Sequence, residues 1–341
     1  MVYPLRHQRV RCRYRGGARI DALTGVEGGG NGYFAEDWIA SDVKASLPGL
    51  EGGEPGITLT AEGMPLPRLL EAEGEALLGP AFLAAYGPRM PILVKLLDAC
   101  QRLAIQAHPT VEFARAHFHS PFGKTECWYI LEAEPRACVF LGFQQGISRE
   151  IWREAFEKQA GMLRWLHRLP VKAGDCFLVP GGMPHAIGGG CLMVELQEPT
   201  DFIVITEKVN AQGEPFTPER MHNGLGFQKM LDCFVYDGLT EQALRARCQA
   251  LPQELGEGLT RIMGPPLTDK FFMDRLRVQG CRTLQSGGSL RVAVVLAGEG
   301  TLGGLPARQG GLFLIPAAEK EIHFHGDLDV ALCAPGTGVT R

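Results

Sequence analysis

The stretch AGDCFLVPGGMPHAIGGG, residues 173–190, combines the turn and strand signals that decide the fold. A glycine turn leads into a short apolar strand that ends at Pro180, and a second glycine-rich turn follows. The same order of features returns in QGGLFLIPAA, residues 309–318. This pattern, seen twice, predicts a weak internal repeat in the form of a duplicated barrel.

Short apolar runs of strand length lie around both copies. They include PILVKLLDA (91–99), TECWYILEA (125–133), RACVFLGF (136–143) and CLMVELQEPTDFIVIT (191–206). Many short strands separated by glycine turns, without β-α-β alternation, are typical of a sandwich or barrel of the jelly-roll kind. The sequence therefore predicts an all-β fold.

Helical patterns interrupt the strands in two places. Residues 65–87 carry Leu, Ala and Glu at helical spacing, broken by Gly and Pro into short helices. Residues 148–169 predict a helix that begins with Ser148 as N-cap and ends before Pro170. Residues 1–60 are rich in glycine and predict short strands with turns.

Bulk composition indicates an ordinary globular protein. The 341 residues are 45% hydrophobic and 21% charged, and the net charge is −4, so no global basic field favours nucleic acid or an anionic membrane. No stretch is long and apolar enough to span a bilayer, and the basic N-terminus lacks the apolar run of a signal peptide. The ten cysteines include no C-x-x-C pair, which argues against a zinc ribbon and a disulfide scaffold. We expect a reduced, cytoplasmic protein, and the sequence does not indicate its oligomeric state.

Four side chains from three segments predict a metal site at a barrel mouth. Gln106 and His108 are two apart, so they share one face of a strand. Glu126 begins the next strand, and His185 lies in the turn after a third. Two imidazoles, a carboxylate and an amide oxygen can hold one Zn²⁺. Each residue alone would be an ordinary surface or strand-end residue, so the prediction rests on their combination.

Other histidines fit this pattern less well. His323 and His325 have the same spacing, but no carboxylate partner is evident near them. His119 is close enough in sequence to Glu126 to be a rival ligand. We expect these histidines to lie on the surface.

Four motifs together, IQAHP, GKTECWYIL, AGDCFLVPGGMPHAIGGG and VELQEPTDF, resemble the class I mannose-6-phosphate isomerase family of zinc-dependent cupins. The resemblance is strong across residues 91–201 and mostly architectural at the C-terminus. It implies cupin barrels with helical insertions. It also implies zinc ligands at the four positions found by spacing: Gln106, His108, Glu126 and His185.

The resemblance implies an aldose–ketose isomerisation through a cis-enediol. Such chemistry needs a base for the proton that moves between adjacent carbons, and a group that stabilises a negative oxygen. By position, Glu195 resembles the proposed base of the family, although it could also be an edge-strand carboxylate facing water. Lys124 would place a cation near an enediolate oxygen or an anionic substrate group, and Asp201 would orient neighbours.

The sequence departs from the family at two positions linked to catalysis or phosphate binding. Ile205 stands where the family usually has an arginine, and Ala104 stands where it has a serine. Isoleucine cannot replace the bidentate partner of an anion. Cations that could compensate as substrate-binding residues are Lys95, Arg102 and Lys208.

Three functions remain open at this point. The first is an isomerase of mannose 6-phosphate or a related hexose phosphate. The second is a metal-bearing cupin that has lost catalysis and binds or senses sugars. The third is a metal-dependent cupin enzyme acting on an uncharged sugar.

The predicted organisation has three parts. Residues 1–210 form the metal-bearing cupin domain with its helical insertions. Residues 211–270 form a linker and helical segment, and residues 271–341 form a second, metal-free barrel.

Overall fold

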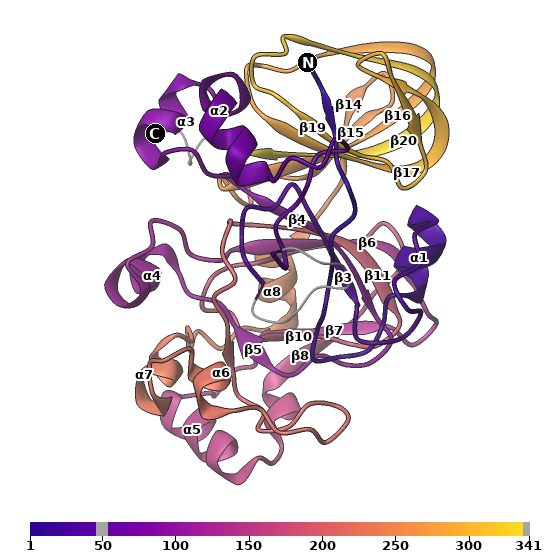
Figure 1. The fold of residues 1–341 in the computed structure, drawn as a ribbon. Coiled ribbons are helices and arrows are strands. Elements are labelled where there is room, and N and C mark those ends of the chain that lie inside the picture. The colour runs from indigo at the N-terminus through magenta and orange to yellow at the C-terminus, as the bar shows by residue number, and fades with distance from the viewer. Residues whose placement is uncertain (46–53, 337–341) are drawn as a thin grey trace.

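Two β barrels, one above the other in Figure 1, make up most of the molecule, and helices lie along their sides. The structure is a computed structural model that describes residues 1–45 and 54–336. The prediction of an all-β fold of two cupin barrels with helical insertions is confirmed. The domain boundaries given above remain predictions, and residues 46–53 and 337–341 within them lie outside the described part.

The first barrel consists of two facing antiparallel sheets. The seven-stranded sheet contains, in spatial order, β13 (Gln249–Ala250), β9 (Cys176–Val179), β6 (Glu126–Ala133), β11 (Cys191–Gln197), β4 (Leu93–Ala99), β3 (Glu36–Ile39) and β2 (Arg9–Val10). The five-stranded sheet contains β12 (Val204–Ile205), β5 (Gln106–Ala107), β10 (His185–Ile187), β7 (Cys138–Phe143) and β8 (Leu166–Pro170).

The second barrel is a single eight-stranded sheet. Its spatial order is β1 (Tyr3–Pro4), β19 (Leu312–Ile315), β17 (Arg291–Leu302), β20 (Glu321–Pro335), β16 (Phe271–Gln285), β15 (Leu259–Met263) and β14 (Gln253–Gly256), and β18 (Leu305–Arg308) pairs with β17. The N-terminal strand β1 therefore belongs to the C-terminal barrel, where Tyr3 pairs with Leu314.

Strand β6 is apolar on both faces because each face packs against a different core. Trp128 and Ile130 belong to the cluster inside the first barrel. Cys127 and Tyr129 belong to a cluster that also includes residues of β16 and β17 in the second barrel. A strand buried on both faces reads as a continuous apolar run rather than an alternating one.

Polar contacts also join the barrels. Arg275 of β16 donates a hydrogen bond to the Tyr129 hydroxyl at 2.8 Å and forms an ion pair with Asp329 of β20. This contact joins β6 of the first barrel to the longest strands of the second.

Helices lie outside the sheets. They are α1 (Ala18–Thr24), α2 (Leu66–Leu78), α3 (Pro80–Tyr86), α4 (Val111–Phe118), α5 (Arg149–Lys158), the 3₁₀ helix η1 (Met162–Trp165), α6 (Pro218–His222), α7 (Phe227–Asp232) and α8 (Glu241–Cys248). Throughout the two described ranges, every helix is too short or too polar to cross a membrane.

Helix α2 packs on the second barrel rather than standing apart. Its last carbonyls would lack partners within the helix. The amide of Ala317 donates to the Leu77 carbonyl at 3.0 Å, and the amide of Ala318 donates to the Ala76 carbonyl at 2.9 Å. The loop after β19 therefore caps the helix.

Two local predictions were wrong. Helix α5 begins at its Ser148 cap as predicted, but it ends at Lys158, and its C-cap Gln159 has a left-handed φ of 50°. Residues 166–170 then form β8, because they complete the edge of the five-stranded sheet beside β7. Within residues 1–60, α1 replaces a predicted strand, and the positive φ of Gly17 and Gly25 at its two ends permits the tight turns.

Leu77→Ala tests the packing of α2. Leu77 is fully buried, so the cavity should lower the free energy of unfolding by about 2–5 kcal/mol. The measurement is urea unfolding followed by circular dichroism. Leu251→Ala is the matched control, because Leu251 is 85% exposed and its loss should change stability by less than about 0.5 kcal/mol. Equal midpoints for the two variants would contradict the packing described here.

Candidate metal centre and active site

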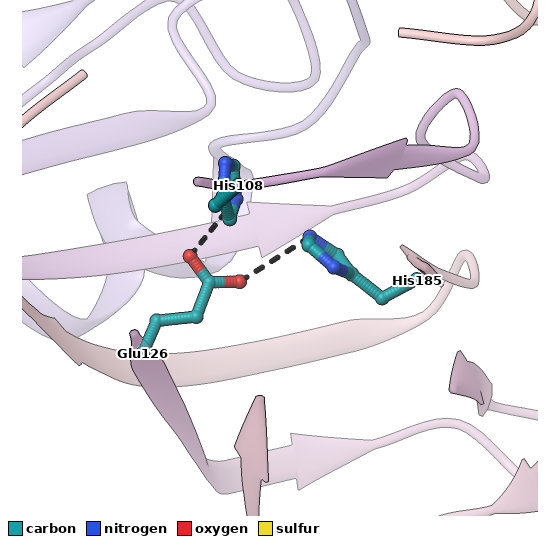
Figure 2. A group of neighbouring side chains, drawn as sticks. All are labelled: His108, Glu126 and His185. Carbon is teal, nitrogen blue, oxygen red and sulfur yellow. Dashed lines mark ion pairs between the residues drawn. The ribbon is translucent and has the colours of Figure 1, made fainter. Parts of the chain in front are cut away.

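Three of the predicted ligands meet between the two sheets of the first barrel (Figure 2). His108 Nε2 lies 3.1 Å from Glu126 Oε2, and His185 Nε2 lies 3.4 Å from Glu126 Oε1. The candidate ligand atoms all lie within 4.8 Å of one another, and all three residues are buried. The arrangement is therefore compact enough for one metal ion.

Gln106 joins this group through the pairing of β5 with β10. His185 and Gln106 are direct cross-strand partners, and the Gln106 amide nitrogen lies 3.2 Å from His185 Nε2. His185 begins strand β10 rather than lying in a turn as predicted, because it pairs with β5 and β7 at once. All four predicted ligands thus converge.

Two glycines hold the turn that follows His108. A Cβ atom added at Gly123 or Gly181 would lie 2.7 Å from the Pro109 carbonyl oxygen. The same carbonyl accepts a hydrogen bond from the Lys124 amide at 3.0 Å. Only glycine permits this close approach of three backbone segments, which fixes the His108 backbone beside the start of β6.

Backbone carbonyls orient both imidazoles. His108 Nδ1 lies 2.8 Å from the Phe202 carbonyl, and His185 Nδ1 lies 3.0 Å from the Met183 carbonyl. A carbonyl only accepts, so each Nδ1 carries the proton. Each Nε2 then turns an unshared pair toward Glu126, as metal-ligating histidines do.

The protonation states of His108, His185 and Glu126 favour the binding of a cation. Burial and the nearby Lys124 lower the pKa of His108 to about 3, and burial lowers the pKa of His185. Burial alone would raise the pKa of Glu126, but Lys124 and His108 hold it well below its usual range. Two neutral imidazoles and an ionised carboxylate therefore face one another.

Glu126 also has an unsatisfied oxygen. Its Oε1 accepts a hydrogen bond from Trp128 Nε1 at 3.1 Å. Its Oε2 lies within ion-pair distance of Lys124 Nζ, at 3.1 Å, yet it accepts no hydrogen bond from any described residue. A buried acceptor without a donor is costly, and it faces the lone pair of a neutral imidazole. This donor set fits a divalent metal, with zinc suited to its nitrogen and oxygen ligands.

Glu195 lies buried in a second charged cluster. Its Oε1 is 3.2 Å from Lys95 Nζ, which is also 3.5 Å from Glu36 and 4.7 Å from the Trp38 ring centre. Burial raises the pKa of Glu195 to about 7, because it outweighs the opposing effect of Lys95. Lys95 is thus held by two carboxylates, and Glu195 is poised to exchange a proton near neutral pH.

A cavity beside these residues receives most of the predicted substrate-binding groups. Arg102 and Asp201 line it, although Arg102 is bound by both carboxylate oxygens of Glu207 at 2.8 and 2.7 Å. Lys208 is exposed, with Nζ 5.5 Å from the Phe156 ring centre, and does not line the cavity. The structure therefore does not bring Lys208 to the site.

Ile205 also lines this cavity. It pairs with Gln106 across β12 and β5 and is 3% exposed. The position at which the family resemblance implies an arginine is thus beside a candidate metal ligand, in an apolar cluster.

Sequence reasoning missed several cavity residues. Glu36 could have been found, because it is a carboxylate at the first position of a strand, as Glu126 is. Arg13, Asn210 and Arg220 lie outside the four motifs, and only the fold brings them to the cavity.

The other histidines lie elsewhere. His119 is the exposed C-cap of α4, with a left-handed φ of 53°. His323 and His325 are exposed on β20, where His323 Nδ1 lies 2.9 Å from Thr283 Oγ1. Within residues 1–45 and 54–336, the one group of three or more side chains of metal-binding type is His108, Glu126 and His185.

Comparisons with known proteins found mannose-6-phosphate isomerases, although no family model matches the chain. Mannose-6-phosphate isomerase ManA of Bacillus subtilis is 41% identical over 115 residues, which are 34% of this chain and 36% of that protein. Mannose-6-phosphate isomerase of Streptococcus mutans is 29% identical over 279 residues, 79% of this chain and 80% of that protein. A crystal structure of mannose 6-phosphate isomerase bound with zinc and yttrium has the same fold, with a TM-score of 0.72 at 14% identity over 98% of this chain and 99% of that one. Together with the converging ligand motifs, these findings show that the chain is similar to mannose-6-phosphate isomerases in sequence and in fold.

Proposed function

We propose that this protein is a zinc-dependent aldose–ketose isomerase that converts mannose 6-phosphate to fructose 6-phosphate. The observation that carries the proposal is the shared cavity. Gln106, Lys124 and Glu195 line one space next to the His108, Glu126 and His185 cluster. A cation site, a fixed ammonium and a carboxylate with a raised pKa are the groups that enediol chemistry requires.

The residues that would hold one zinc ion are Gln106, His108, Glu126 and His185. When bound there, the metal supplies a Lewis acid that polarises the oxygens of the substrate. The zinc bound to a solved relative of the same fold supports this choice of metal.

The remaining chemistry belongs to side chains of this chain. Glu195 removes the proton from C2 of the aldose and returns it to C1, while the proton of the C2 hydroxyl moves to the oxygen on C1, which gives the ketose. Lys124 stabilises the negative oxygen of the intermediate. Lys95 restrains the carboxylate of Glu195 at 3.2 Å without lowering its pKa to the usual range.

The alternative is a metal-binding cupin that binds or senses sugars without turnover. The observation that favours it is the buried Ile205 next to Gln106, because its side chain supplies no guanidinium at that position. Buried charges such as Lys124 and Glu195 favour the isomerase, because an idle site would gain stability by losing them.

His185→Ala tests the metal and the function together. Loss of one ligand from a small set should remove most bound zinc and abolish turnover of mannose 6-phosphate in a coupled assay. A chelator should have the same effect on the wild type, and free mannose should serve as the uncharged comparison.

His323→Ala is the matched control, because His323 is exposed on the other barrel. It should keep both zinc and activity. Full zinc content in His185→Ala would reject the ligand assignment, and a wild type inactive on every hexose phosphate would reject the isomerase.

The pH profile tests Glu195 as the base. The carboxylate must be ionised to accept a proton, and its pKa is about 7. The value of kcat/KM should therefore rise with pH and level off above an apparent pKa near 7, which belongs to Glu195 together with the charges coupled to it. An acid limb centred near the ordinary value of a glutamate would contradict this role.

Glu195→Gln should lower kcat by about 10²–10⁴-fold. Glu27→Gln, which changes an exposed carboxylate, should leave both kcat and the pH profile unchanged.

Ile205→Arg distinguishes an altered enzyme from an inactive one. If other cations already hold the substrate anion, a further buried charge is costly and turnover should fall or stay the same. Turnover is measured at equal zinc content, with Ile205→Met as the neutral control of similar volume. A gain of about 10²–10³-fold over an inactive wild type would instead indicate that an anion-binding group has simply been lost.

A further inference from the structure

The cavity has more positive charge than its own carboxylates can balance. Six cationic side chains and three carboxylates line it: Arg11, Arg13, Lys95, Arg102, Lys124 and Arg220, and Glu36, Glu195 and Asp201. Glu126 and Glu207 pair with Lys124 and Arg102 from outside the lining, so six cations face five carboxylates, and the remaining positive charge favours an anion.

The inner cations already have partners. Lys95 is held by Glu36 and Glu195, Lys124 by Glu126, and Arg102 by Glu207. Arg11 is exposed and stacks 5.1 Å from the Tyr33 ring centre. These contacts leave Arg13 and Arg220 to be explained.

Arg13 and Arg220 share an unusual state. Both are half-buried, and neither lies within 4.0 Å of a carboxylate in the described part of the chain. In both, the buried Nε has no hydrogen-bond partner. Buried donors normally have partners, so the Nε of each of these arginines lacks an acceptor.

An unpartnered Nε does not by itself identify an anion-binding arginine, because three other arginines have one. Arg9, Arg282 and Arg291 also have one, but each forms an ion pair, with Asp21, Glu257 and Asp274 respectively. Only Arg13 and Arg220 combine an unpartnered Nε, no ion pair and a place in the cavity, as far as residues 1–45 and 54–336 are concerned.

A buried asparagine fixes the backbone that carries one of them. Asn210 Nδ2 donates to the Arg13 carbonyl at 3.0 Å and to Glu214 at 2.7 Å. Its Oδ1 accepts from the amides of Gln212 and Glu214. The N-terminal segment and the segment leading to α6 are thus joined at the cavity, although 197 residues separate them in sequence.

We propose that Arg13 and Arg220 form the phosphate-binding subsite of this protein and take over the anion contact that Ile205 cannot make. Guanidinium groups bind phosphate oxygens through paired, charge-assisted hydrogen bonds, and the unpartnered Nε atoms supply such donors. The assignment of the phosphate as that of a hexose phosphate rests on the function proposed above.

The test is titration of the zinc-loaded protein with inorganic phosphate, followed by calorimetry. Arg13→Gln and Arg220→Gln should each weaken phosphate binding by about 10–100-fold, because each removes a charge-assisted hydrogen bond. Zinc content should not change. Arg149→Gln is the matched control, since Arg149 is half-buried but forms its ion pair with Asp232 outside the cavity.

A second readout is steady-state turnover of mannose 6-phosphate. Both Gln variants should raise KM by a similar factor and change kcat less. Arg13→Lys keeps the charge without the Nε donor and should retain part of the phosphate affinity. This variant tests the subsite even if Arg13→Gln does not fold.

The outcomes separate the two proposals. Phosphate binding that depends on both arginines in a protein without isomerase turnover would support the subsite and reject the proposed function. A wild type that does not bind phosphate, or variants that bind it as tightly as the wild type, would overturn the subsite.

Discussion

A carboxylate buried in a barrel core is the constraint on which the site depends. Glu126 is ionised, lies between two neutral imidazoles, and keeps one oxygen without a hydrogen bond. An isolated charge in such a place would destabilise the fold. Its surroundings make sense as the coordination shell of a cation, and the fixed tautomers of His108 and His185 follow from the same requirement.

Much of this site could be predicted from the sequence because its ligands lie in short motifs. The i, i+2 spacing put Gln106 and His108 on one strand face, and polar residues at the ends of apolar runs marked Glu126 and His185. The strands themselves could be predicted because glycine turns bound them clearly. The end of α5 could not, because pairing with β7 decides the structure of residues 166–170 and no local signal reports it.

The cations of the cavity were the least predictable part. The sequence predicts Lys95 as a cation that could bind the substrate. The fold places Glu36 and Glu195 beside it, so its charge is already paired. Arg13 and Arg220 lie outside the four motifs, and Asn210 joins their segments only in three dimensions. Local sequence patterns therefore identify the candidate metal ligands. The cations that line the cavity are brought together only by long-range contacts.

The two-sided burial of β6 has a consequence for solubility. Cys127 and Tyr129 face the second barrel, so a chain without that barrel would expose a flat apolar face of the seven-stranded sheet. Large exposed apolar patches promote aggregation. The second barrel therefore buries this apolar face and limits aggregation of the first barrel. This role does not require a ligand on the second barrel.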